Sequence, residues 1–136
     1  MIFMERMQSD VVMIEEPFPS YLDALMKNGI RLDLKPFEVL LSKLQQPQRA
    51  YPSILVGGTN GKGSIAAMIT AILMKAGCRV GLYTSPHLVD VRERIRVNGQ
   101  MIGLEEIGAC IAEIRTADDP GLTYFECLTA VAFLIC

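Results

Sequence analysis

A glycine-rich stretch directly behind a short apolar run constrains this chain more than any other feature. Residues 54–64 read ILVGGTNGKGS and hold four glycines, a lysine and a serine. Glycine inside a helix or strand costs roughly 0.5–1 kcal/mol relative to alanine, so such a cluster needs a compensating purpose. A turn between a buried strand and the N-terminus of a helix provides one, because its backbone N–H groups converge on one point and bind an anion. The stretch therefore predicts a phosphate-binding loop in an α/β fold.

Residues 58–64 supply each chemical part of such a loop. Glycines let the backbone approach an anion without a Cβ in the way. Lys62 would neutralise the β- and γ-phosphate oxygens of a nucleotide, and the Ser64 hydroxyl could reach Mg²⁺. The alternative is a glycine-rich turn that holds no ligand, but a predicted strand before it and a predicted helix after it favour the phosphate. The predicted nucleotide-binding residues are Gly58, Thr59, Asn60, Gly61, Lys62, Gly63 and Ser64, and Lys62 is also the predicted catalytic residue.

Hydrophobic periodicity predicts the elements around this loop. The β-branched, apolar runs 53–58 and 78–84 are typical of buried strands, as in a parallel sheet. Asn98-Gly99 between alternating residues predicts a β-hairpin over 94–102. Helices are predicted from Ser20 as N-cap to Gly29, over 36–44, over 64–77 with Gly77 past the end, over 104–115 and over 124–136. Residues 1–16 have no clear period, and we expect a flexible leader there.

Composition excludes several classes of function. The chain has 136 residues, of which 51% are hydrophobic, and a net charge of −2. This charge gives no basic surface for nucleic acid, and no apolar run reaches the roughly 18 residues of a membrane span. Acidic residues in the first 16 positions do not fit a secretory signal, and the four cysteines lack the spacing of a metal site. We therefore expect a cytoplasmic protein with reduced thiols, and no nucleic-acid or membrane partner.

Four motifs in order along the chain resemble the folylpolyglutamate synthase/dihydrofolate synthase family of Mur-type ATP-dependent ligases. They are IRLDLKPFEVL at 30–40, GTNGKGS at 58–64, YTSPHLVDVRERIRVNG at 83–99 and LTYFECLTA at 122–130. The resemblance implies an incomplete part of a Mur-ligase-type central domain, with a parallel P-loop sheet flanked by helices and a β-hairpin insertion. Residues 17–136 would be the N-terminal portion of this ATP-binding domain.

The resemblance also implies an activity and its ligands. Such enzymes use ATP and Mg²⁺ to convert a carboxylate of dihydropteroate or folate into an acyl phosphate, which the amine of L-glutamate attacks. By this resemblance Ser85 is a Mg²⁺ ligand at the end of the strand beside the phosphate loop, where open α/β sheets bind ligands. The residues expected to bind the pterin-containing substrate are Leu32, Asp33, Leu34, Thr123, Tyr124, Phe125 and Glu126.

Some of these residues have a plainer interpretation. Thr123 and Glu126 also fit an N-cap and its capping box, and both roles could hold together. For His87, the only histidine, we favour a hydrogen bond that orders its loop over a role as catalytic base. The arginines of 92–96 could meet an anionic substrate or form a solvated hairpin face.

The family's later Mg²⁺ ligands, its modified lysine and its C-terminal domain have no counterpart in these residues. We therefore expect no ligase turnover from the chain alone, poor solubility, and a monomer for the full-length enzyme. Two alternatives stay open, a non-catalytic nucleotide- or folate-binding remnant and a fragment of a ligase for peptidoglycan precursors. The sequence does not decide between dihydrofolate synthesis and polyglutamate extension.

Overall fold

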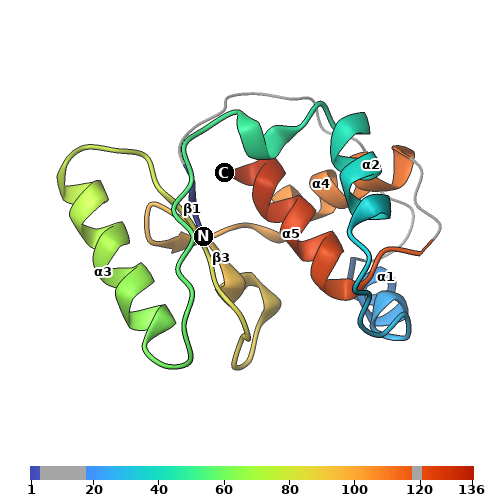
Figure 1. The fold of residues 1–136 in the computed structure, drawn as a ribbon, viewed down its shortest axis with the longest axis horizontal. Coiled ribbons are helices and arrows are strands. Elements are labelled where there is room, and N and C mark those ends of the chain that lie inside the picture. Colours follow the sequence, from blue (N-terminus) through green and yellow to red (C-terminus); the bar gives the residue numbers. More distant parts are fainter. Residues whose placement is uncertain (4–17, 118–120) are drawn as a thin grey trace. The chain divides into compact units, whose positions relative to one another are not determined.

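The computed structural model describes residues 1–3, 18–117 and 121–136 (Figure 1). The helices are α1 (Phe18–Met26), α2 (Lys35–Lys43), α3 (Lys62–Lys75), α4 (Leu104–Thr116) and α5 (Tyr124–Ile135), with 3₁₀ turns η1 (Pro47–Arg49) and η2 (Val91–Arg94). The strands are β1 (Ile2–Phe3), β2 (Gly81–Tyr83), β3 (Ile95–Val97) and β4 (Gln100–Met101). Two compact units result: a sheet unit (described residues 1–3, 49–103 and 135–136) and a helical unit (18–48, 104–117 and 121–134).

The sheet unit is built on strands in the order β1-β2-β3-β4. All three pairings are antiparallel. The predicted hairpin is confirmed, because Asn98 (φ 50°) and Gly99 (φ 78°) form the turn between β3 and β4. The Asn98 side chain also accepts a hydrogen bond from the Val80 N–H at 2.9 Å, which ties the turn to the residue before β2.

The parallel sheet predicted from the sequence is not found among the described strands. The segment 53–58 forms a single bridge at Ile54 rather than a strand, and Leu55 is 82% exposed. A parallel strand is stable when neighbours pair with it and helices cover both of its faces. Segment 53–58 lacks that cover, so its apolar pattern alone does not make it a strand here.

The first residues of the predicted flexible leader form a strand, contrary to expectation. Ile2 and Phe3 form β1, with Ile2 opposite Leu82 and Phe3 opposite Gly81. The Met1 ammonium donates a hydrogen bond to the Tyr83 carbonyl at 2.9 Å. Positions 4–16 of the predicted leader lie outside the described residues.

Helix α3 lies beside the strands of its unit (Figure 1) and contacts β2. It ends at Lys75, with Gly77 past its end as predicted. The Gly77 N–H donates to the Met74 carbonyl, while the Cys78 N–H donates to the Leu73 carbonyl. This pair of bonds is a Schellman cap. The buried residues of α3 are Ala66 and Thr70, whereas its larger apolar side chains Ile65, Met68 and Ile72 are 48%, 64% and 68% exposed.

The helical unit forms as the sequence predicts, apart from its first boundary. Helix α1 begins at Phe18, so Ser20 lies inside the helix and is not its N-cap. The Arg115 guanidinium of α4 lies 5.3 Å from the centre of the Tyr21 ring of α1, and Phe37 of α2 stacks on Phe133 of α5 at 6.5 Å. Fully buried aliphatic residues fill the core, among them Ile107, Ile111, Ile114, Leu122, Leu128 and Val131.

The described part of the chain contains no helix long and apolar enough to cross a membrane. No disulfide joins its four cysteines. Burial raises the pKa of the Cys110 thiol to about 12, so this thiol stays protonated at neutral pH.

Candidate functional site

The glycine loop leads directly into α3 in the sheet unit. Gly61 is the N-cap of the helix with φ 77°, in the left-handed region that favours glycine. Lys62 and Gly63 occupy the first turn, so the helix begins two residues earlier than the sequence predicted. The Lys62 ammonium donates hydrogen bonds to the carbonyls of Gly58 at 2.6 Å and Thr59 at 3.1 Å. The lysine therefore folds back over its own loop and holds it closed.

A cavity of about 120 Å³ connects this loop with the end of β2. Lys62, Gly63 and Ser85 line it together. Thus the structure brings the predicted catalytic lysine and the predicted Mg²⁺ ligand to one place, although they are 23 positions apart in the sequence. Pockets that enclose a whole small-molecule ligand usually measure about 300–1,000 Å³, so this cavity suits a phosphate group rather than a complete nucleotide.

The other predicted loop residues are not among those that line the cavity. Gly58, Thr59, Asn60, Gly61 and Ser64 are exposed to solvent. Sequence reasoning in turn missed several residues that do line it, namely Met1, Val56, Ala66, Tyr83 and Thr84. Adjacency to Ser85 could have indicated Thr84, but no local signal indicates Met1, which arrives through the long-range pairing of β1. Burial lowers the pKa of the Met1 ammonium.

The loop after Ser85 is held by His87. The Arg94 Nε donates a hydrogen bond to His87 Nδ1 at 2.8 Å. The interpretation of His87 as a residue that orders its loop is therefore confirmed. The bond also engages one of the arginines that could have met an anionic substrate.

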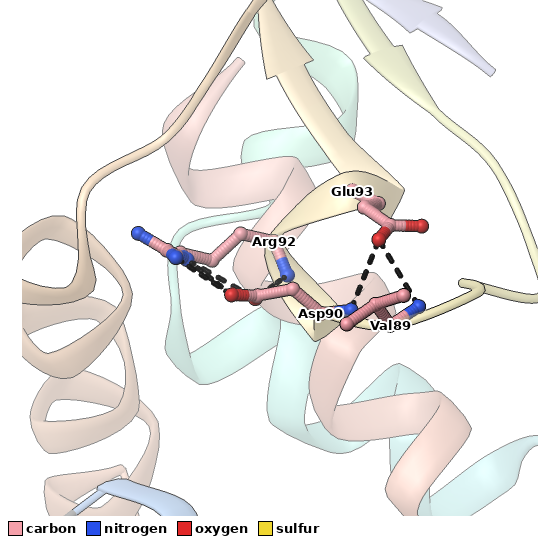
Figure 2. Close-up of polar contacts among 4 residues, drawn as sticks. All are labelled: Val89, Asp90, Arg92 and Glu93. Atoms are coloured by element: carbon pink, nitrogen blue, oxygen red, sulfur yellow. Dashed lines mark hydrogen bonds and ion pairs between the residues drawn. The ribbon is translucent and has the colours of Figure 1, made fainter.

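The carboxylates of Asp90 and Glu93 form further hydrogen bonds within the loop that follows Ser85 (Figure 2). Glu93 accepts hydrogen bonds from the backbone N–H groups of Val89 and Asp90 at 3.1 and 3.0 Å. It also accepts one from the backbone N–H of Leu88 at 2.8 Å. Asp90 caps η2 through the Arg92 N–H at 2.9 Å and forms an ion pair with the Arg92 guanidinium at 2.6 Å. The bonds from Leu88 and Asp90 lower the pKa of Glu93. The bond from the Arg92 side chain lowers the pKa of Asp90 to about 2.

In the helical unit, the predicted capping box at the start of α5 is confirmed. Glu126 Oε2 accepts hydrogen bonds from the Thr123 N–H at 2.8 Å and the Thr123 hydroxyl at 2.9 Å. The Glu126 N–H donates to Thr123 Oγ1 at 3.2 Å. Both side chains are buried, and Glu126 Oε1 accepts no hydrogen bond from the described residues. Between them, Phe125 is 55% exposed and Tyr124 is half-buried.

The loop over 30–34 presents apolar side chains to solvent. Leu32 is 94% exposed and Leu34 is 61% exposed. The Asp33 carboxylate accepts a hydrogen bond from the Lys35 N–H at 3.0 Å, at the start of α2. Asn28 and Arg31 tie this loop to the carbonyls of Leu122 and Gly121, directly before the capping box. The helical unit therefore joins the two predicted substrate-binding segments, while the glycine loop and Ser85 form a separate group in the sheet unit.

Comparison with known proteins indicates the class and then the family. No family model matches the chain. The chain is 39% identical to Escherichia coli FolC solved in complex with DHPP and ADP, with a TM-score of 0.80 over 88% of this chain and 30% of that one. A bifunctional folylpolyglutamate synthase/dihydrofolate synthase from Yersinia pestis, complexed with AMPPNP and Mn ion, is 34% identical with a TM-score of 0.79, over 94% of this chain and 32% of that one. Both solved structures have Mur-ligase-type folds.

Curated relatives agree with the solved structures. The chain is 43% identical over 108 residues to the dihydrofolate synthase/folylpolyglutamate synthase of Escherichia coli, covering 79% of this chain and 26% of the relative. It is 35% identical over 122 residues to the enzyme of the same name from Bacillus subtilis, covering 85% of this chain and 28% of the relative. Over most of its length the chain is therefore similar to the folylpolyglutamate synthase/dihydrofolate synthase family. It spans little more than a quarter of the length of these two relatives.

Proposed function

We propose that this chain carries the phosphate-binding and acceptor-binding parts of an ATP-dependent ligase that joins L-glutamate to dihydropteroate or folate. The convergence of Lys62, Gly63 and Ser85 on one cavity is the observation that carries the proposal. The names of the relatives, and the ADP, AMPPNP and Mn ion bound in the solved structures, support it. Residues 17–136 would then be part of the ATP-binding domain.

The residues at the cavity fit a nucleotide phosphate. Gly61 at the N-cap of α3 leaves the first backbone N–H groups of a 14-residue helix at the loop, where the helix dipole favours an anion. The Lys62 ammonium can exchange the Gly58 and Thr59 carbonyls for phosphate oxygens, which carry full negative charge. The hydroxyls of Ser64 and Ser85 are hard oxygen donors of the kind that Mg²⁺ accepts. Bound Mg²⁺ would supply further neutralisation of phosphate charge.

The proposed reaction needs mainly orientation and charge neutralisation from the protein. A carboxylate oxygen of the acceptor attacks the γ-phosphorus of ATP, the bond between this phosphorus and the β,γ-bridging oxygen breaks, and ADP leaves. The amine of glutamate then attacks the acyl carbon of the resulting acyl phosphate. Inorganic phosphate leaves, the amine loses a proton, and an amide remains. Lys62 would hold the transferred phosphoryl group in line throughout.

The helical unit would bind the acceptor. Leu32, Leu34 and Phe125 offer exposed apolar and aromatic surface on two joined segments, and a flat heteroaromatic ring can stack on such surface. Tyr124 and Asp33 would add polar contacts. Thr123 and Glu126 are buried in the capping box, so we propose that they serve the acceptor by fixing the start of α5 next to Phe125.

The nucleotide part of the proposal is tested by calorimetric titration of the chain with ATP, with and without Mg²⁺. Lys62→Ala removes a charge-assisted contact and should weaken ATP binding about tenfold to a hundredfold. Ser85→Ala should reduce the gain in affinity that Mg²⁺ gives. Lys75→Ala, at the other end of α3, is the matched control and should leave the affinity unchanged. Equal affinities for Lys62→Ala and the wild-type chain would contradict the proposal.

The ligase part is tested on the complete product of the reading frame that encodes this chain. ADP release should require dihydropteroate or folate together with L-glutamate, and should not occur with a peptidoglycan precursor as acceptor. ATP binding without any acceptor-dependent ADP release would instead favour a non-catalytic nucleotide-binding protein. The same assay, run with a monoglutamated and a glutamate-free acceptor, distinguishes polyglutamate extension from dihydrofolate synthesis.

A further inference from the structure

Two side chains from the loop after α1 attach this loop to adjacent carbonyls just before α5. Asn28 Nδ2 donates a hydrogen bond to the Leu122 carbonyl at 2.7 Å. The Arg31 guanidinium donates through Nη2 to the Gly121 carbonyl. The bonded residues are 94 and 90 positions apart in the sequence. Attachment at two neighbouring carbonyls fixes both the distance and the orientation of one segment against the other.

Because Gly121 has no side chain, it leaves room for the Arg31 guanidinium. A Cβ at position 121 would lie 3.3 Å from Arg31 Nη2, closer than ordinary van der Waals contact allows, and Gly121 has φ 108°. The glycine therefore permits the guanidinium to approach the backbone closely. Arg31 is half-buried, whereas the nearby Lys27 is exposed.

The attached segments are the two that carry the candidate acceptor surface. Ile30 and Leu32 are each 94% exposed, and their loop follows Asn28 directly. On the other side, the carbonyls at 121 and 122 precede the capping box and the 55% exposed Phe125. An apolar loop that faces solvent needs bonds at its base to stay in one conformation, because its own side chains contribute little packing.

We propose that Asn28 and Arg31 are positioning residues for the acceptor, which hold the loop over 30–34 against the start of α5. The inference rests on the proposed function, because it assigns the 30–34 loop and Phe125 to acceptor binding. Without the two bonds, the loop must be ordered when the acceptor binds, and this loss of entropy opposes binding. The nucleotide site belongs to the sheet unit and does not depend on these bonds.

The experiment measures two affinities on the same 136-residue chain, for dihydropteroate and for ATP. Asn28→Asp replaces the donor to Leu122 with an acceptor, and Arg31→Ala removes the donor to Gly121. Each should raise the Kd for dihydropteroate about tenfold, equivalent to ~1.4 kcal/mol, and leave the Kd for ATP unchanged. Arg31→Lys keeps a cationic donor and should recover part of the affinity. Lys27→Ala removes an exposed charge one residue from Asn28 and should change neither Kd.

Amide hydrogen exchange gives a second readout that does not need the acceptor. Residues 30–34 should exchange faster in Asn28→Asp and Arg31→Ala than in Lys27→Ala, while the interior of α4 stays protected. Unchanged exchange, or equal dihydropteroate affinity in the wild-type chain and Arg31→Ala, overturns the inference and leaves the proposed function standing. A wild-type chain that binds ATP but no dihydropteroate overturns the acceptor part of the proposed function, and with it the inference.

Discussion

The capping box at the start of α5 allows a stability prediction to be worked out from the structure. Thr123→Ala removes the hydroxyl that donates to Glu126 Oε2 at 2.9 Å and accepts from the Glu126 N–H at 3.2 Å. The backbone bond from the Thr123 N–H to Glu126 at 2.8 Å remains. The substitution therefore breaks half of a reciprocal pair without removing a large side chain.

The expected loss follows from two contributions. Replacing an N-cap threonine by alanine costs about 1 kcal/mol. Glu126 is 6% exposed and its Oε1 already accepts no hydrogen bond from the described residues, so losing one donor to Oε2 should cost about 1 kcal/mol more. We expect the free energy of unfolding to fall by about 2 kcal/mol and Tm to fall by roughly 6 °C.

Urea unfolding followed by circular dichroism measures this loss, with Thr123→Ser as the matched control. Serine keeps the hydroxyl and should retain most of the stability. If Thr123→Ser loses as much stability as Thr123→Ala, the hydroxyl is not the source of the stabilisation. A midpoint for Thr123→Ala equal to that of the wild-type chain would refute the reasoning altogether.

Two further predictions concern the sheet unit. The pKa values of Glu93 and Asp90 are lowered in the folded chain, so both groups contribute stability at neutral pH that is lost in acid. For Asp90, whose pKa falls from 3.8 to about 2, the loss occurs as the pH falls from about 4 through about 2. Amide resonances of Leu88, Val89 and Asp90 should shift over this range, and Glu93→Gln should abolish the part of the shift due to Glu93; amides that do not respond to acid would contradict this. Separately, the exposed apolar face of α3 should promote aggregation, and Ile72→Glu, at a position that is 68% exposed, should raise the soluble fraction in light scattering without lowering Tm. Ala71→Glu adds the same charge beside this face and is the control, and an equal gain from both variants would show that net charge alone is responsible.

Local signals in the sequence predicted most of the helices and the hairpin. Helical periodicity together with Gly77 located α3 and its end, and Asn98-Gly99 located the turn between β3 and β4. The capping box was predictable because its two members, Thr123 and Glu126, are three residues apart. In each case the residues that determine the structure are close together in the sequence.

Features that depend on contacts between residues far apart in the sequence could not be predicted from local patterns. Nothing in residues 1–3 indicates that they pair with β2, about 80 positions later. The run 53–58 has the composition of a buried strand but not the neighbours that a strand needs, and α3 buries Ala66 and Thr70 instead of its larger side chains. At the candidate site, the meeting of Lys62 with Ser85 was expected from the resemblance to the ligase family, which places Ser85 at the strand end beside the phosphate loop. The bonds from Asn28 and Arg31 to a turn some 90 residues away were not.

The loop over 88–90 and the glycine loop each bind a charged side chain of the protein itself, but the two side chains have opposite charges. Three backbone N–H groups at 88–90 surround the carboxylate of Glu93, so this cradle already contains an anion that the chain itself provides. At the glycine loop the internal ion is a cation, because Lys62 rests on the carbonyls of Gly58 and Thr59. An incoming phosphate would be repelled by the Glu93 carboxylate at the first loop, whereas under the proposed function Lys62 would attract it at the second. If the proposed function holds, the Glu93 carboxylate thus prevents the 88–90 loop from competing with the glycine loop for phosphate.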